Sequence, residues 1–242
     1  MAIYIGSQKV IPHGIAKVYV GPNKVYEKSS YSTTLSDNTW DQIKAAIDSG
    51  LASSFGWLGQ SKDGWQLVDL TAGRYSKYDG SGTTNAVFMK EGHTGGSYGS
   101  YDATNGTNSK GYYGSSASTT LDSYYDNTLP SDIKAIITRC YVKCKQLNNS
   151  TINSQAAYLF LPASVEVGTQ SSSNEGTLLS YFQVGTSTEA KDLRKTTFQY
   201  YLRTPVSGQT STGYSYYIKT DGTIGTNSSS YTKYYYRPCF AI

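Results

Sequence analysis

Histidines, cysteines and paired carboxylates are the side chains that could carry catalysis, and this chain places few of them together. Its 2 histidines are His13 and His93, and neither lies in a nucleophile elbow, a zinc-protease motif or a phosphate-binding loop. We expect His93, in a Gly-rich stretch, to be solvated. Acidic residues are scattered, so their spacing does not define the carboxylate pair of a glycosidase. The sequence therefore predicts a protein that is not an enzyme.

The 3 cysteines are Cys140, Cys144 and Cys239. Cys140 and Cys144 lie four positions apart on a predicted helix, but no third and fourth ligand follow with the spacing of a zinc site. The simplest interpretation is that all three are small buried apolar residues. We expect no disulfide framework, no bound metal and no cofactor.

Tyrosine is the residue type that stands out, and it gathers in residues 196–242. Tyrosines alternate there with Ser, Thr, Gly, Asn and Gln instead of with aliphatic residues. Tyr offers a large rigid contact face and one hydroxyl, and small polar neighbours add adaptable hydrogen bonding. This is the composition of a recognition surface, although any single tyrosine could equally be a strand former on a half-buried sheet.

The composition bounds the class of protein. A chain of 242 residues with 24 Gly, 24 Tyr, 38% hydrophobic and 16% charged residues is expected to be loop-rich and β-containing, with a real core. The formal charge of +4 is spread along the chain without a basic run, which argues against binding of nucleic acid. No stretch approaches the roughly 20 apolar residues of a membrane helix, and MAIYIGSQKVIPHG lacks the pattern of a signal peptide.

Residues 1–30 are predicted to form a separate module, followed by a linker over residues 31–36. Two apolar runs, 15–20 and 24–27, are joined by Gly21-Pro22-Asn23 and indicate a small β-hairpin. A hairpin of this size is marginally stable alone. We therefore expect it to pack on a neighbouring chain or on the main domain.

Residues 37–242 are predicted to form the main domain, which begins with a helix. Thr39 and Gln42 fit a capping box, Trp40, Ile43 and Ile47 share one face, and Gly50 ends the helix. In the first half of the domain we expect strands at Trp57, 65–70 and 86–89, with a turn at Asp63-Gly64 before the second, and then loops over 92–118. Two further helices are predicted over 133–144 and 187–193, with a strand over 158–162 between them. The predicted closing strands are 200–202, 214–218 and 236–242, with a turn at Asp221-Gly222. Because helices and strands do not alternate regularly, the α+β class is favoured over a parallel α/β sheet.

Several of these segments together resemble the DUF6273 domain. They are TWDQIKAAIDSG, TLDSYYDNTLPSDIKAII, YLFLPASVEVG, YYLRTP and IKTDGTIGTNSSSYTKYYYRPCFAI, spread over residues 37–242. That domain occurs in phage and bacterial surface proteins and is related to the C-type lectin fold, in the branch that holds formylglycine-generating enzymes. The resemblance implies a C-type lectin-like fold.

Two departures from the relatives limit what the resemblance implies. The oxidase relatives use a cysteine pair, whereas Cys239 stands alone in RPCFAI. Sugar-binding C-type lectins hold calcium with EPN or QPD and WND motifs, and this chain has none of these. The resemblance therefore implies neither oxidase activity nor calcium binding.

The N-terminal KVYVGPNKVYEK is similar to short modules at the start of tail proteins in phages of Gram-positive bacteria. This similarity implies an attachment or oligomerisation module that contacts other virion tail proteins. It also implies location in the virion, extracellular after release, and a homo-oligomer such as a trimer.

The chain also resembles the variable proteins of diversity-generating retroelements, which display mutated Tyr, Ser and Asn positions on a C-type lectin-like scaffold. On that resemblance the scaffold positions are Leu202, Arg203, Pro205, Ile218, Gly222, Arg237, Pro238 and Phe240. The ligand-binding display positions are Tyr200, Tyr201, Gln209, Tyr214, Tyr216, Asn227, Ser229, Tyr231, Lys233, Tyr234 and Tyr235. Tyr217 and Tyr236 are expected to be partly buried.

The leading hypothesis is a receptor-binding protein, or adhesin, at a phage tail or fibre tip. Its tyrosine-rich face would contact a protein or glycan on the host bacterium. One alternative is a structural baseplate or tail subunit whose tyrosines pack against neighbouring virion proteins. Another is a relative of the formylglycine-generating enzymes with its own activity.

Overall fold

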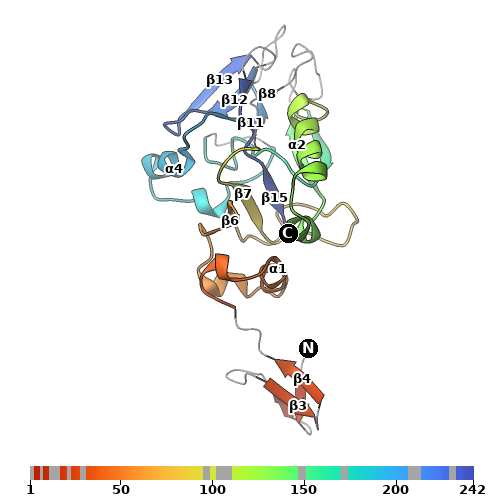
Figure 1. Cartoon of the computed structure of the whole chain (residues 1–242). Helices are drawn as coiled ribbons and strands as arrows, with labels where there is room; N and C mark the ends of the chain where they lie inside the picture. The colour runs from red at the N-terminus through yellow and green to blue at the C-terminus, as the bar shows by residue number, and fades with distance from the viewer. Residues whose placement is uncertain are drawn as a thin grey trace. The chain divides into compact units, whose positions relative to one another are not determined.

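The computed structural model describes residues 3–5, 8–10, 17–20, 23–27, 31–94, 99–101, 111–146, 151–169, 174–206, 214–228 and 233–242, with the backbone alone at 3–27, 99–100, 228 and 233. The chain divides into two compact units, Met1–Ser32 and Thr33–Ile242. Figure 1 shows the elements of both units.

The smaller unit contains two antiparallel strand pairs. β3 (Lys17–Val20) pairs with β4 (Asn23–Glu27), which confirms the predicted hairpin. β1 (Ile3–Ile5) pairs with β2 (Gln8–Val10), and this pair was not predicted. Each of these two strands has only 3 residues, which leaves too little alternation for a sequence pattern to be recognised.

The first helix of the larger unit, α1 (Trp40–Asp48), begins at the predicted capping box. The Gln42 backbone N–H donates to Thr39 Oγ1 at 3.2 Å, and the Thr39 N–H donates to Gln42 Oε1 at 2.8 Å. Trp40, Ile43 and Ile47 are buried, as their spacing predicts. Gly50, with φ of 73°, follows the helix, and the short 3-10 turns Leu35–Asp37 and Ala52–Phe55 flank it.

The core lies on a four-stranded antiparallel sheet in the order β15-β7-β6-β5. Its strands are β5 (Ser61–Lys62), β6 (Trp65–Asp69), β7 (Val87–Lys90) and β15 (Cys239–Ala241). Phe88 and Phe240 stack with ring centroids 5.0 Å apart, and Trp40 meets Phe88 edge-on at 5.4 Å. The last strand of the chain thus completes a sheet whose other strands come from its first half.

Two predictions in this region are confirmed and two need correction. β6 and β7 occupy the predicted positions, and Asp63 and Gly64 form the turn before β6 with φ of 51° and 76°. Trp57 is buried but lies outside any strand, because it follows the turn that ends at Phe55. The closing strand is shorter than the predicted 236–242, since Pro238 has no N–H to donate to a neighbouring strand.

The predicted helix over residues 133–144 is wrong in its second half. α3 (Ser131–Ile136) ends early, and Cys140 begins a strand, β9 (Cys140–Lys145), that pairs with β10 (Ile152–Ala157). Cys140, Val142 and Cys144 are buried while Tyr141 and Lys143 are exposed. Apolar residues four apart satisfy both a helical and a strand period, and the pairing with β10 decides between them.

Residues 92–118 were predicted to form loops, but they contain regular structure. β8 (Gly99–Ser100) pairs with β14 (Lys233–Tyr234), and α2 (Ser116–Asn127) begins inside the range. The Ser118 N–H donates to Ser115 Oγ at 3.2 Å and caps α2. Its buried residues are only Ala117, Ser118 and Leu121, so the apolar stripe is too weak to indicate a helix.

Residues 158–162 are mostly buried as predicted, but they do not form a regular strand. Phe160 alone bridges to Cys239, with backbone hydrogen bonds of 2.7 and 3.0 Å. The predicted helix over 187–193 is confirmed as α4 (Ser187–Arg194), which has a capping box formed by Thr186 and Glu189. A short 3-10 turn, Ser180–Phe182, precedes it.

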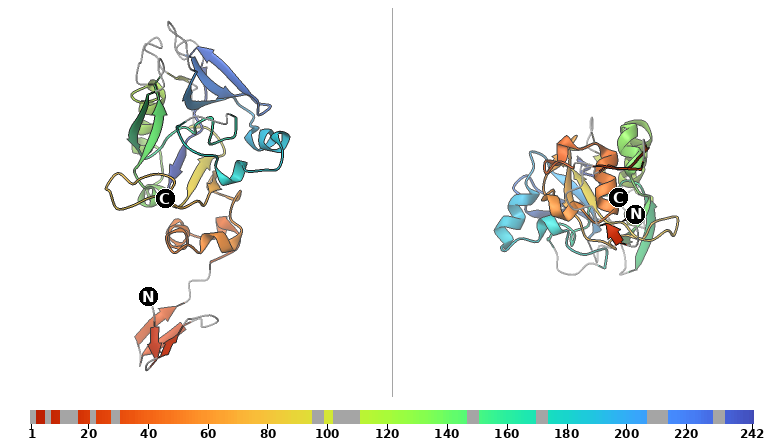
Figure 2. Two further views of the ribbon diagram at one scale, coloured as in Figure 1. Left: turned by 180° about the vertical axis from the view of Figure 1, so that it is seen from behind. Right: turned by 90° about the horizontal axis from the view of Figure 1, so that it is seen from below.

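A three-stranded sheet lies at the opposite end of the larger unit from α1 (Figure 1 and Figure 2). It consists of β11 (Tyr200–Pro205), β12 (Tyr214–Ile218) and β13 (Ile224–Ser228), the last of which was not predicted. Every pair of strands in the described part is antiparallel, so the α+β class is confirmed. None of the helices in the described residues has the length and apolarity needed to cross a bilayer.

Candidate ligand-binding surface

The β11–β12–β13 sheet sorts the terminal tyrosines onto two faces. Residues directly opposite in an antiparallel pair share a face. Ser215 is opposite Asn227 and Tyr217 is opposite Gly225, whereas Tyr216, opposite Thr226, lies on the other face. Tyr214 shares the face of Tyr216, because side chains alternate along a strand.

Tyr234 lies over the face that carries Tyr217. The two rings stack with centroids 4.1 Å apart, and Asn227 Nδ2 donates to the Tyr234 hydroxyl at 3.0 Å. Tyr201 meets Tyr234 edge-on at 5.1 Å. Burial is the main cause that raises the pKa of Tyr234 to about 12, and the hydrogen bond with Tyr217 is the second. The Tyr234 hydroxyl is therefore protonated at neutral pH, and its ring is held from two sides.

Gly225 provides the space for this stack. A Cβ at this position would overlap the phenol ring of Tyr217, so the ring lies directly on the backbone of β13. Any larger residue at position 225 would push Tyr217 toward Tyr234. The glycine therefore sets the height of the tyrosine stack above the sheet.

Tyr235 belongs to a second aromatic group, with His93 and Phe198. The His93 and Tyr235 rings stack at 4.0 Å, and Phe198 meets Tyr235 edge-on at 5.4 Å. His93 was expected to be solvated, and this expectation is wrong, because the ring packs between two aromatic side chains. The three residues are far apart in the sequence, so local composition gave no signal of their contact.

Arg203 fixes the scaffold beneath the sheet. It is completely buried, and its Nη1 and Nη2 donate to the two Glu166 carboxylate oxygens at 2.7 and 2.6 Å. Nε donates to the Lys143 carbonyl at 2.9 Å, and Nη2 also donates to the Glu175 carbonyl at 2.8 Å. Burial lowers the pKa of Arg203, but the Glu166 carboxylate outweighs burial and holds it above its usual range. The prediction that this arginine pairs inside the scaffold is confirmed.

Arg237 has the same kind of role at the other end of the segment. Its Nε donates to the Lys90 carbonyl at 2.7 Å, and its guanidinium lies 5.2 Å from the centre of the Tyr200 ring. All the predicted scaffold positions are buried, namely Leu202, Arg203, Pro205, Ile218, Gly222, Arg237, Pro238 and Phe240. Tyr217 and Tyr236 are buried too, as expected.

Tyr200 and Tyr201 were predicted to be display positions, and the structure corrects this. Both are 0% exposed, because elements cover both faces of β11. Tyr200 packs against Arg237, and Tyr201 meets Tyr101 at 5.6 Å. Sequence reasoning could not separate them from the other tyrosines, since their cover comes from distant segments.

The remaining predicted display positions fall into three groups. Five side chains are half-buried, and they make up what we call the tyrosine-rich surface. Tyr214 and Tyr216 lie on one face of the β11–β12–β13 sheet, Asn227 and Tyr234 lie on the other, and Tyr235 packs with His93 and Phe198. For Lys233 only the backbone is described, as part of β14. Gln209, Ser229 and Tyr231 lie outside the described residues.

A family model for a domain of unknown function, DUF6273, matches residues 85–242, well over half of the chain. The chain belongs to the DUF6273 family. The predicted resemblance to this domain is thus confirmed, although the match begins after α1 and β6. No curated protein and no solved structure matches the chain.

The DUF6273 region holds all three cysteines, and the charges of Arg203 and Glu166 act on each of their thiols. All three thiols are free and buried, as predicted, and burial raises the pKa of Cys140 and of Cys144 to about 12. Burial raises the pKa of Cys239 as well. A protonated thiol is a poor nucleophile and a poor metal ligand. Among the described residues, no three His, Cys, Asp or Glu side chains are grouped closely enough to hold a metal ion. The tyrosine-rich surface thus offers rings, hydroxyls and an amide, which is chemistry suited to binding.

Proposed function

We propose that this chain is the receptor-binding protein, or adhesin, of a phage tail or fibre tip, and that its tyrosine-rich surface binds a protein or glycan on the host bacterium. One observation carries the proposal: four tyrosines and an asparagine are half-buried on and around the two faces of the β11–β12–β13 sheet, whose scaffold positions are buried. Such a surface presents partly exposed aromatic contacts on a rigid support.

The physical argument rests on preorganisation. Tyr234 is stacked on Tyr217 and hydrogen-bonded by Asn227, so little rotational freedom remains to be lost on binding. Tyrosines in the centre of an interface commonly cost about 2 kcal/mol or more when truncated. Several copies on an oligomeric tail would add avidity to each weak contact. The role proposed is binding, without catalysis, cofactor or nucleic-acid partner, and burial of the three thiols argues against a cysteine nucleophile.

The test is the binding of labelled protein to cells of the host bacterium. The double variant Tyr214→Ser, Tyr216→Ser removes two rings from one face of β12, and binding should fall at least about tenfold. The matched control is Tyr113→Ser, which removes a ring that is 41% exposed outside the tyrosine-rich surface. Equal binding by both variants would contradict the proposal. If the double variant instead prevents particle assembly, the alternative of a structural baseplate or tail subunit is supported.

The proposal includes a C-type lectin-like fold of the formylglycine-generating-enzyme branch. Support comes from the α+β architecture with small antiparallel sheets and from the motif pieces LRTP and RPCFAI, which lie in its buried parts. An experimental structure that aligned with no C-type lectin-like domain would remove this part of the proposal. Receptor binding would remain to be decided by the cell-binding test.

We further propose that the surface is diversified by a retroelement. The division between buried scaffold positions and half-buried tyrosines supports this, since mutation is tolerated only where packing does not depend on the side chain. Sequencing the DNA that flanks the gene should reveal a reverse transcriptase and a near-copy of the 3′ end of the gene. Finding neither would contradict diversification.

The smaller unit is proposed to attach the chain to other tail proteins in the virion and to support a homo-oligomer such as a trimer. Its strand pairs are short, and isolated hairpins of that size need a partner for stability. Mass spectrometry of purified particles should detect the chain in the tail. Its absence from particles that adsorb normally would contradict the virion location.

A further inference from the structure

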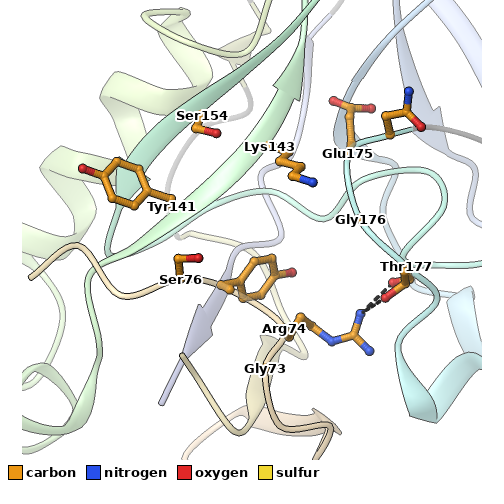
Figure 3. Close-up of a pocket in the computed structure, with 11 residues that line it drawn as sticks. Gly73, Arg74, Ser76, Tyr141, Lys143, Ser154, Glu175, Gly176 and Thr177 are labelled. Carbon is orange, nitrogen blue, oxygen red and sulfur yellow. Dashed lines mark hydrogen bonds between the residues drawn. The ribbon is translucent and has the colours of Figure 1, made fainter. Parts of the chain in front are cut away.

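A polar hollow of about 560 Å³ lies in the larger unit, away from the residues of the tyrosine-rich surface. Three segments form it, as Figure 3 shows: the chain around Gly73–Ser76, the paired strands β9 and β10, and the chain from Asn174 to Thr177. Its volume falls in the range of small-molecule sites. The two sites share no residue.

Arg74 fixes one edge of the hollow. Its Nε and Nη2 donate to the Asp69 carboxylate at 2.6 and 2.9 Å, and Nη1 donates to the carbonyl and hydroxyl oxygens of Thr177, both at 2.8 Å. All five donors of the guanidinium have partners once the bond to the Leu178 carbonyl is counted. Arg74 therefore holds the walls together instead of offering a charge to a ligand.

Four other polar side chains of the walls have no hydrogen-bond partner within the described residues. Within the described residues, the side chains of Ser76, Lys143, Ser154 and Asn174 make no hydrogen bond or ion pair with the protein. Together they supply two hydroxyls, an amide and an ammonium around one space. Glu175 also lines the hollow, and its buried Oε2 has no hydrogen-bond partner at normal distance among the described residues. The four side chains are exposed and can bond to a polar ligand in place of water, and the buried, unmet Oε2 of Glu175 is the group that indicates one.

Tyr141 adds an aromatic wall, and its ring is held in place. It is 38% exposed, and Tyr78 lies 5.6 Å from it. The Arg139 guanidinium covers Tyr78 at 4.2 Å and lies 5.6 Å from Tyr158, which in turn stacks on Tyr125 at 4.2 Å. This row of rings and one cation preorganises Tyr141 beside the polar groups.

We propose that this hollow binds a sugar residue, with Tyr141 against the C–H face of the ring and Ser76, Ser154, Asn174 and Lys143 on its hydroxyl groups. A sugar needs both donors and acceptors at several points around its edge, and it needs an apolar surface on its face. An apolar ligand would leave the four polar side chains unmet. A nucleotide or other polyphosphate needs several unpaired cations to bind its phosphates. The lining has two cations, and Arg74 is paired with Asp69, so among the described residues Lys143 alone has an unpaired charge. The hollow therefore suits a neutral sugar better than a polyphosphate.

The test is a glycan array with the whole chain, followed by saturation-transfer NMR with glucose, galactose, N-acetylglucosamine and rhamnose at millimolar concentration. The wild-type chain should bind at least one sugar. Tyr141→Ala should weaken that binding about tenfold or more, and Asn174→Ala should weaken it severalfold. The matched control is Leu58→Ala, which truncates a side chain that is 40% exposed and lies outside the hollow. Thermal unfolding shows whether each variant keeps its fold.

Two results would overturn the proposal: no sugar bound by the wild-type chain, or sugar binding that Tyr141→Ala and Asn174→Ala leave unchanged. If Tyr141→Ala fails to fold, Asn174→Ala and Ser154→Ala decide alone, because both replace side chains without protein partners in the described residues. The Tyr214→Ser, Tyr216→Ser variant should bind sugar normally. Receptor binding at the tyrosine-rich surface is thereby tested independently.

Discussion

At the scale of single residues, Arg203 connects several segments of the larger unit. It is buried with Glu166 and joins β9, β11 and the segment of Glu175 through its five donors. Replacing it by Met leaves the Glu166 carboxylate buried without its cationic partner, with only the Tyr75 hydroxyl and the Ala163 N–H of the described residues donating to it. We expect Arg203→Met to lower the free energy of unfolding by about 3–5 kcal/mol, measured by urea denaturation.

The control for this prediction is a pair at the surface. Lys44 and Asp48 form an ion pair of 2.7 Å whose side chains are 34% and 45% exposed. Lys44→Met should cost about 0.5 kcal/mol or less. Equal losses from the two variants would show that the buried pair contributes little. The sequence alone identified Arg203 as a scaffold residue, but its partner, Glu166, could not be predicted, since nothing local to YLFLPASVEVG indicates that this carboxylate is buried.

Glu175 gives a prediction about pH. Burial raises the pKa of its carboxyl, and the opposing effects of Arg203 and Thr204 do not cancel it. The folded chain therefore holds the proton of the Glu175 carboxyl more tightly than the unfolded chain, in which a Glu has a pKa of about 4.3. Protonated Glu175 therefore stabilises the fold at pH values below the pKa that it has in the unfolded chain. This contribution is lost as the pH rises through the pKa that it has in the folded chain.

Glu175→Gln removes this titration while keeping an oxygen that can accept from the Lys145 N–H, which donates to Glu175 Oε1 at 2.9 Å. The difference in unfolding free energy between the variant and the wild type should grow in favour of the variant as the pH rises from about 4 to about 8. Urea denaturation at several pH values measures it. A difference that is constant with pH would contradict the raised pKa.

Among the helices and strands, α4 and the turn between β12 and β13 depend on each other. Arg194 at the end of α4 donates from Nε to the Gly222 carbonyl at 3.0 Å. A Cβ at Gly222 would overlap the backbone carbonyl of Lys191, and its φ of 81° is already unfavourable for other residues. Gly222→Ala should therefore destabilise the chain through both strain and collision.

Gly50 is a matched control, because its φ is 73° and nothing lies within 4 Å of a Cβ there. Gly50→Ala should cost about 1–2 kcal/mol from backbone strain alone, and Gly222→Ala should cost at least about 1 kcal/mol more. Chemical denaturation of the two variants compares them. If they lose the same stability, the contact between α4 and the turn is not tightly packed.

The elements also show which sequence signals are sufficient. The capping box predicted at Thr39 marks the start of α1, because the hydrogen bonds that start a helix are local. The structure shows a second capping box at Thr186, at the start of α4. The strand β9 was mistaken for a helix, because its partner β10 is what selects the strand. Likewise, the sequence identified the tyrosines of the C-terminal region, but burial of Tyr200 and Tyr201 comes from residues far along the chain.

For the chain as a whole, the central sheet shows that the folding unit is larger than the DUF6273 match. The match begins at residue 85, yet β7 pairs with β6 on one side and with β15 on the other. Trp65 of β6 meets Phe240 of β15 at 4.8 Å, and Trp40 of α1 meets it at 6.1 Å. The matched region thus depends on packing from residues before it.

A chain of residues 33–242 should therefore fold with the urea midpoint of the larger unit in the full-length protein, and a chain of residues 85–242 should not fold. The shorter chain lacks α1, β5 and β6, which would expose Phe88 and Phe240 and leave one edge of β7 unpaired. Circular dichroism and amide NMR dispersion distinguish a folded from an unfolded or aggregated chain. A cooperative unfolding transition in residues 85–242 would mean that the core closes without Trp40 and Trp65. It would also restrict the structural domain to the matched region.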